Sequence, residues 1–212
     1  MPVSDDSRLV QQAQGGDLAA FNRLVLRHQD HVYRLCLRLL GDPDGADDAA
    51  QETFIAAYEH LGAFRGGSLR AWLLRTASRR CYDVHRRRGR RPTTSLDRPA
   101  QPGASETVVA AVPDPQAGPE ASAERHELEA MLQQGLLALP EEQRTALTLC
   151  DVLGYDYQAI ADIMEVELGT VKSRINRGRR RMRDHLAGHR ELLPDPYRQS
   201  FGGYRGPEAT DG

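Results

Sequence analysis

Residues 157–183 read YQAIADIMEVELGTVKSRINRGRRRMR, and this stretch decides the fold. It predicts a short helix from Tyr157 to Met164, a tight connection, and a longer helix from Gly169 or Thr170 to about Leu186. The apolar side chains expected to face one another across the pair are Ile160, Ala161 and Met164 on the short helix, and Val171, Ile175 and Met182 on the long one. Two helices of these lengths, joined this tightly, have the dimensions of a helix-turn-helix.

Between Lys172 and Arg183 the longer helix has seven Lys and Arg residues and no acid. The basic residues expected on its outer face are Lys172, Arg177, Arg179, Arg180, Arg181 and Arg183. In the DNA major groove, Arg and Lys pair with guanine and Asn pairs with adenine, whereas further arginines neutralise phosphates. A solvated helix normally mixes charges of both signs, so this face predicts DNA binding. The residues expected to meet duplex DNA are Thr170, Lys172, Ser173, Asn176, Arg177 and Arg180.

Working outward, residues 92–123 hold six prolines among small residues and cannot bury enough surface to fold. The sequence therefore predicts an all-α protein of two small helical domains joined by a flexible linker, the second containing the helix-turn-helix. The expected divisions are a first domain over 1–91, a linker over 92–123, a second domain over 124–187 and a disordered tail over 188–212.

The first domain reads as three helices with a separated charge pattern. The first helix begins after Asp17 as N-cap, the second ends near Gly62, and the third begins after Ser68 and ends before Pro92. Residues 42–59 contain six carboxylates and no Lys or Arg, whereas residues 65–91 contain ten Arg against one acid. Acidic and basic blocks in one chain suggest several partners of different charge.

The bulk composition excludes several classes of protein. Only 6% of the residues are aromatic, which suits small helical domains better than barrels or sandwiches. Cys36, Cys81 and Cys150 lie far apart, and neither a metal cluster nor a glycine-rich phosphate loop is present. We therefore expect no metal site, no cofactor and no enzyme activity. The polar N-terminus and the lack of an apolar run of about 20 residues predict a cytoplasmic protein without membrane insertion.

Three strings carry a resemblance to a known family. LPEEQRTALTL (139–149) together with residues 157–183 resembles region 4 of extracytoplasmic-function (ECF) sigma factors, and Gly169–Ile175 followed by Arg177 is close to that family's most specific string. DGADDAAQETF (44–54) resembles the region 2.2 helix, and residues 69–91 resemble regions 2.3 and 2.4. The resemblance implies an alternative sigma factor that brings core RNA polymerase to promoters, reads the −35 element with the helix-turn-helix and holds the melted −10 strand.

The resemblance also implies roles for residues and partners. Asp47, Asp48, Gln51 and Glu52, expected on the helix face away from Phe54, are the implied contacts to the polymerase β′ clamp helices. The polymerase β flap and an anti-sigma factor are further implied partners, and the protein is placed at the bacterial nucleoid. The residues implied at the −10 element are Phe64, Arg65, Arg75, Arg79, Arg80, Arg86 and Arg87.

Two details of the −10 segment qualify the resemblance. The family places a pocket for an unpaired base in the loop around Phe64–Ser68, while Trp72 shares a stripe with Leu69 and Thr76 and is expected in the core. Arg79 stands where the family usually has Asn. Its guanidinium can bind a phosphate but cannot reproduce the paired donor and acceptor of an amide.

Two rival functions remain compatible with parts of the pattern. A dimeric repressor or activator would use the same helix-turn-helix, bind its operator without polymerase and place a dimer interface in the first domain. A nuclease or nucleic-acid modifier would need a metal bound by an acidic cluster, for which Asp44, Asp47, Asp48 and Glu52 are the candidates.

Overall fold

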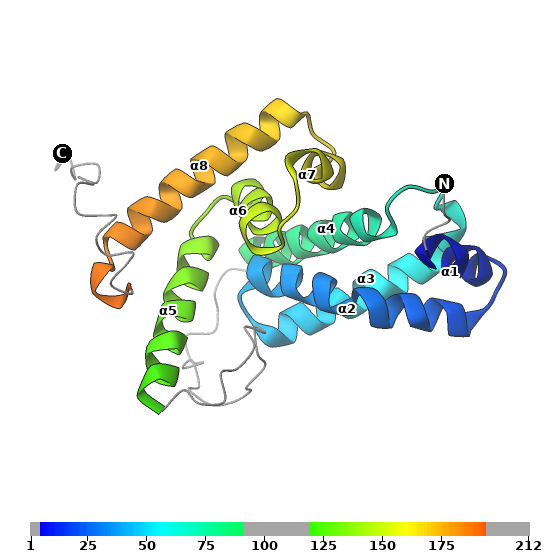
Figure 1. Cartoon of the computed structure of the whole chain (residues 1–212), viewed down its shortest axis with the longest axis horizontal. Helices are drawn as coiled ribbons and strands as arrows, with labels where there is room; N and C mark the ends of the chain where they lie inside the picture. Colours follow the sequence, from blue (N-terminus) through cyan, green and yellow to red (C-terminus); the bar gives the residue numbers. More distant parts are fainter. Residues whose placement is uncertain (1–4, 91–118, 194–212) are drawn as a thin grey trace.

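The computed structural model describes residues 5–90 and 119–193, and within these two ranges every regular element is a helix (Figure 1). The first unit contains α1 (Asp5–Gln14), α2 (Leu18–Leu40), α3 (Pro43–His60), the 3₁₀ turn η1 (Leu61–Ala63) and α4 (Leu69–Arg90). The second contains α5 (Pro119–Leu137), α6 (Glu141–Leu147), the π turn η2 (Thr148–Val152), α7 (Tyr157–Met164), α8 (Leu168–Ala187) and the 3₁₀ turn η3 (Arg190–Leu192). The all-helical expectation is confirmed.

Short polar side chains start the helices of the first unit where the sequence predicts. The Asp17 carboxylate accepts from the Ala20 amide at 3.1 Å, and the Ser68 hydroxyl accepts from the Ala71 amide at 3.2 Å. Gly41 ends α2 in the left-handed conformation, at φ 79°. The core between these helices is built from the buried side chains of Leu24, Leu35, Leu39, Ala46, Ala49, Leu73, Leu74 and Ala77.

Helix α1 is an element that the sequence interpretation missed. Leu9, Val10 and Ala13 are buried against the rest of the first unit. Asp6 anchors the helix, because its carboxylate binds Arg27 at 2.6 Å and His28 at 3.0 Å, both on α2. The signal was present as the spacing i, i+1, i+4, but ten residues are too short for such a pattern to decide by itself.

The second unit confirms the helix-turn-helix and shifts two boundaries. Helix α7 spans Tyr157–Met164 as predicted, and α8 begins one residue before the predicted Gly169. Helix α5 begins at Pro119, within the stretch expected to be linker, since proline suits a first helical position and the alanines and glutamates after it favour a helix. The second unit also continues past residue 187, because Leu193, expected in the tail, is only 4% exposed.

The two units pack against each other, with α7 lying beside α4 and α5 beside the end of α2 (Figure 1). One contiguous apolar core contains side chains of both units. Hydrogen bonds cross the boundary: the Tyr82 hydroxyl donates to Thr145 Oγ1 at 2.8 Å, and Arg38 donates to Gln133 Oε1 at 2.9 Å. The structure is therefore a closed arrangement of two helical units.

Candidate nucleic-acid and polymerase interfaces

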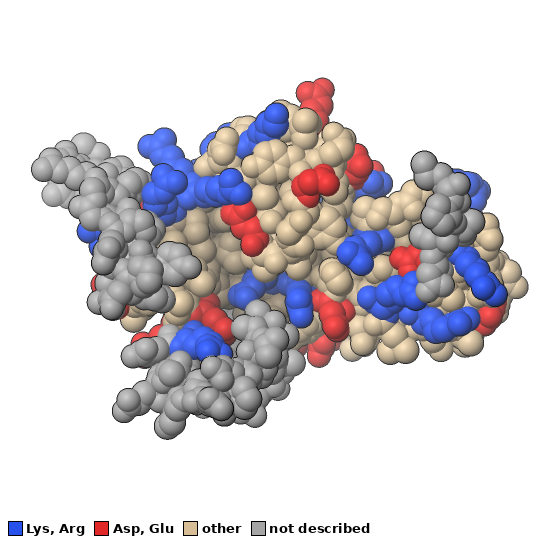
Figure 2. Space-filling model, in the orientation of Figure 1, with Lys and Arg blue, Asp and Glu red and all other residues tan. Residues whose placement is uncertain are grey.

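The exposed face of α8 carries the residues predicted to meet duplex DNA. Asp156 caps α7 by accepting from the Ala159 amide at 2.8 Å, and Glu165 makes the turn in the left-handed conformation, at φ 54°. Val171 and Ile175 are fully buried against α7 and α6, which turns the other face of α8 outward. Lys172, Asn176, Arg177 and Arg180 are exposed, whereas Thr170 and Ser173 are half-buried. The six predicted residues therefore lie on one helix, and Figure 2 shows Lys and Arg side chains gathered along α8.

Two other arginines of α8 are engaged within the second unit. Arg174 binds Glu142 at 2.6 Å, and Arg179 binds the Asp151 carboxylate through two nitrogens, at 2.6 and 3.0 Å. The hydrogen bond from Arg179 holds the pKa of Asp151 below its usual range, against the opposing effect of burial. Arg179 was expected on the outer basic face, but the structure ties it to a carboxylate. Arg177 instead donates to the Ser173 hydroxyl within the predicted patch.

The residues predicted at the −10 element lie on α4 and on the loop before it. Phe64 and Trp72 pack with ring centroids 5.5 Å apart. Trp72 is half-buried, so its ring contacts both the core and the loop that carries Phe64. Gly66 and Gly67 both adopt positive φ, at 111° and 91°, which non-glycine residues rarely adopt. Arg65 donates back to the Gly62 carbonyl at 2.5 Å, which holds the loop in a tight turn.

The seven predicted −10 residues are not equally accessible in the closed arrangement. Arg75 binds Glu165 of the helix-turn-helix at 2.9 Å and also donates to the Asp162 carbonyl, and Arg79 binds the other oxygen of Glu165. Arg86 binds Asp83 at 3.2 Å, one turn away on its own helix. Arg87 is exposed and Arg80 is half-buried. The arginine that departs from the family pattern thus contacts the second unit.

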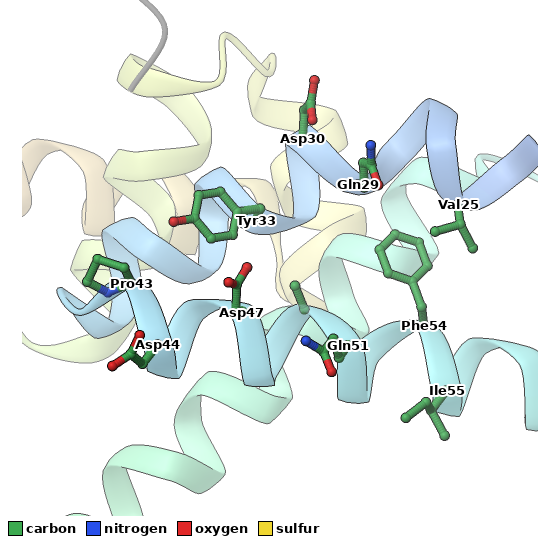
Figure 3. A pocket seen from close by; sticks show the side chains of 11 residues that line it. Val25, Gln29, Asp30, Tyr33, Pro43, Asp44, Asp47, Gln51, Phe54 and Ile55 are labelled. Carbon is green, nitrogen blue, oxygen red and sulfur yellow. The ribbon is translucent and has the colours of Figure 1, made fainter. Parts of the chain in front are cut away.

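A groove between α2 and α3 carries part of the predicted polymerase surface (Figure 3). It encloses about 620 Å³ and combines an apolar lining, to which Phe54 and Ile55 contribute, with the polar Asp47 and Gln51. The prediction that the polymerase-binding residues lie away from Phe54 is wrong for Asp47 and Gln51, because positions 47, 51 and 54 are spaced i, i+4, i+7 and share one face. Asp48 and Glu52 are exposed outside the groove lining.

The sequence interpretation also missed two residues that organise the site. Arg144, in the quoted string 139–149, is 6% exposed and holds the helix ends at the boundary of the units. It donates to the carbonyls of Leu136 (3.0 Å), Leu137 (2.7 Å), Leu139 (3.0 Å) and Leu39 (2.6 Å). Gln14 of α1 donates to the carbonyls of Leu61 (2.9 Å) and Phe64 (3.0 Å), at the two ends of η1. The contact of Arg144 with Leu39 and both contacts of Gln14 join residues 47 or more positions apart, so no local pattern marks them.

Comparison with known proteins agrees with this geometry. The family description Sigma-70 region 2 matches residues 24–91, and Sigma-70, region 4 matches residues 129–182. Over 175 residues the chain is 42% identical to the RNA polymerase sigma-H factor of Pseudomonas aeruginosa, which covers 82% of this chain and 90% of that protein. It is also 40% identical over 177 residues to the ECF RNA polymerase sigma factor SigE of Mycolicibacterium smegmatis, covering 82% of this chain and 65% of that protein. This chain belongs to the ECF sigma factor family.

Solved structures of sigma factors share the fold. CnrH in complex with the cytosolic domain of CnrY superposes with a TM-score of 0.63 at 22% identity, over 86% of this chain and 97% of that one. RpoE of Bartonella quintana in complex with the anti-sigma factor NepR gives 0.56 at 24% identity, over 78% and 96%. Membership of this family makes the chain a promoter-recognising alternative sigma factor, and the rival dimeric repressor is not favoured.

The placement of possible metal ligands and the polarity of the helices bear on the remaining expectations. Among residues 5–90 and 119–193, no group of three or more His, Cys, Asp or Glu side chains is arranged to hold a metal ion. Within the same ranges, none of the helices combines the length and the apolar character that crossing a membrane requires. Cys36 and Cys81 are buried and Cys150 is half-buried, and all three are free thiols.

Proposed function

We propose that this ECF sigma factor reads promoters with two separate basic surfaces and binds core RNA polymerase through a third, acidic one. The first basic surface is the exposed face of α8, the second is the α4 face with the loop before it, and the acidic surface is the part of α3 from Asp47 to Glu52. The observation that carries the proposal is this division of three charged surfaces among three helices. Polymerase supplies the catalysis, and the sigma factor is not itself an enzyme.

The two DNA surfaces are assigned different tasks. Lys172, Asn176 and Arg177 near the start of α8 contact base edges of the −35 duplex, while Thr170, Ser173 and Arg180 bind its backbone. At the −10 element, Phe64 and Arg65 lie beside the unpaired bases. The basic groove for the single strand is formed by Arg75, Arg79, Arg80, Arg86 and Arg87.

The acidic surface on α3 fits a basic helical partner. Asp48 and Glu52 are exposed, and Asp47 and Gln51 line the groove whose floor contains Phe54. Carboxylates around an apolar floor offer charge complementarity and burial together, which suits the β′ clamp helices. We assign the β flap to the second unit, and a protein bound to polymerase and promoter DNA would lie in the cytoplasm, at the nucleoid.

The closed arrangement requires a change of shape before promoter binding. Arg75 and Arg79 are bound to Glu165, so the −10 groove is partly occupied by the helix-turn-helix. Solved neighbours of the same fold are complexes of CnrH with CnrY and of RpoE with the anti-sigma factor NepR. We assign an anti-sigma factor as a partner of this chain also, one that stabilises the closed form.

Capture of purified core polymerase tests the proposal. The wild-type chain is expected to bind core enzyme, and Asp48→Arg/Glu52→Arg to lose most of that binding, because two contacts become repulsive. The matched control is Glu59→Arg/Glu127→Arg, which makes the same charge change at two exposed positions outside the proposed surface. Failure of the folded wild type to bind core enzyme would refute the proposed function, and equal loss in both double variants would refute the assigned surface.

A further inference from the structure

The loop that carries Phe64 and Arg65 borders two cavities of different character. The first, of about 750 Å³, lies towards the second unit and is lined in part by Asp162, Glu165 and Glu167. The second, of about 460 Å³, lies towards α1 and is lined by Ser7, Val10, Gln11, Gln14, Gly62, Phe64, Arg65, Gly66 and Gly67. Three acidic residues line the first cavity against Arg65 and Arg75, and Arg75 is paired with Glu165, whereas the nine residues lining the second include Arg65 and no acid. A nucleotide carries a phosphate, so electrostatics favours the cavity beside α1.

The chemistry of the cavity beside α1 suits an unpaired nucleobase. Gln11 contributes a carboxamide, which offers both donors and an acceptor to a base edge, and Arg65 contributes a cation at the rim. Val10 and Phe64 add apolar surface for the face of the ring. The volume of about 460 Å³ is ample for one base and its sugar.

Gln14 determines the shape of this cavity. Its Nε2 donates to the Leu61 carbonyl at 2.9 Å and to the Phe64 carbonyl at 3.0 Å. Both amide hydrogens are thereby directed at the loop, and Oε1 remains as an acceptor on a residue that lines the cavity. The two bonded carbonyls lie at either end of η1, immediately before Arg65 and the two glycines of positive φ. The side chain therefore ties α1 to the loop across 47 residues of sequence or more.

We propose that Gln14 is a positioning residue that holds the loop open for an unpaired base of the −10 strand, and that Gln11 determines which base is accepted. Both residues lie on α1, upstream of residues 24–91, where the region 2 description matches. The inference rests on the proposed function, because it assumes that this chain opens promoters with core polymerase. It adds a helix outside the matched region to the base-reading site.

Transcription from a promoter library randomised over the −10 region, with wild-type chain and core polymerase, tests the proposal. Sequencing the transcripts gives the base preference at every −10 position. Gln14→Leu removes both hydrogen bonds to the Leu61 and Phe64 carbonyls. Gln14→Glu keeps the size of the side chain, but its carboxylate cannot donate and repels the two carbonyl oxygens. Both are expected to reduce the preference at one position about tenfold while leaving the other positions and core binding unchanged. Gln11→Ala is expected to alter the preferred base at that same position.

The matched control is Gln12→Leu, on the same helix but outside the cavity lining. It is expected to keep the wild-type profile, and the thermal midpoints of all variants report any general loss of folding. If Gln14→Glu and Gln14→Leu keep the wild-type profile while the wild type transcribes, the inference is overturned and the proposed function stands. If the wild type selects no template with core enzyme, the proposed function falls and the inference falls with it.

Discussion

Arg144 joins the ends of two helices at the boundary between the first and second units. Its guanidinium donates to carbonyls at the C-terminus of α5 and at the C-terminus of α2, where the helices leave their last acceptors unpaired. A cation at these helix ends is also favoured by the helix dipole. Burial lowers the pKa of Arg144 from its usual value, but the four carbonyl contacts stabilise the charged form that makes them.

Replacing Arg144 with Met is expected to cost about 3–5 kcal/mol of unfolding free energy, because four buried or half-buried carbonyls each lose a bond from the guanidinium. Chemical denaturation measures the difference. Arg125→Met, at an exposed position of α5, is the control and is expected to change stability by less than about 0.5 kcal/mol. A similar loss in both variants would contradict the assigned role.

At the same scale, the α8 patch separates into residues that read bases and residues that bind phosphate. Asn176→Ala is expected to weaken binding to the preferred −35 duplex by about 1–3 kcal/mol and to relax preference at one base pair. Arg180→Ala is expected to weaken all duplexes alike and to reduce the salt dependence of binding by about one counterion. Fluorescence anisotropy of holoenzyme on duplexes with single −35 substitutions distinguishes the two patterns. If Asn176→Ala and Arg180→Ala changed binding to the substituted duplexes in the same way, the assignment of base reading to Asn176 and phosphate binding to Arg180 would be wrong.

At the scale of elements, the contact between α1 and α2 depends on a buried histidine. His28 is fully buried, and its Nε2 lies 3.0 Å from the Asp6 carboxylate. Burial lowers the pKa of His28 below 6.5, and the nearby Arg70 and Arg27 act in the same direction, against Asp6. The pKa of Asp6 is also lowered, since bonds to Arg27 and His28 outweigh the opposing effect of burial.

These shifts predict a stability that falls on acidification. Below pH 6.5 the unfolded chain takes up a proton at His28 that the folded chain resists, so stability is lost as pH falls from 6.5 through the lower folded pKa. Asp6 adds a second loss that begins below its usual pKa of 3.8. Urea denaturation between pH 7.5 and 5.0 measures the first loss. His28→Gln is expected to flatten this dependence, and an unchanged slope would show that another group is responsible.

At the scale of the whole molecule, two binding surfaces on separate units act together only if the units can move apart. Each surface alone offers a small interface, whereas joining them makes the second contact intramolecular. In the closed arrangement Glu165 forms ion pairs with Arg75 and Arg79. We have proposed that these two arginines bind the backbone of the −10 single strand. Closure and binding of the −10 strand therefore compete for the same two guanidinium groups.

Glu165→Gln is expected to weaken the closed arrangement by about 1 kcal/mol, roughly a fivefold shift, because exposed ion pairs contribute little each. Binding of a single-stranded −10 oligonucleotide by the isolated chain should increase by a similar factor. Glu59→Gln removes the same charge at an exposed position of α3 outside the cavities beside the loop, and is expected to leave oligonucleotide binding near the wild-type value. Equal effects of the two variants would attribute the change to net charge instead of to the contact.

The sequence by itself predicted the helices α2 to α4 and the helix-turn-helix, the caps Asp17 and Ser68, and the outward face of α8 with Lys172, Asn176 and Arg177, but it did not predict α1. These features follow from the helical period and from capping, which involve residues only a few positions apart. Only the tertiary structure decided that Glu165 binds Arg75 and Arg79, and that Gln14 holds the loop before α4. Both contacts join residues tens of positions apart, and packing, which has no local periodicity, selects such partners.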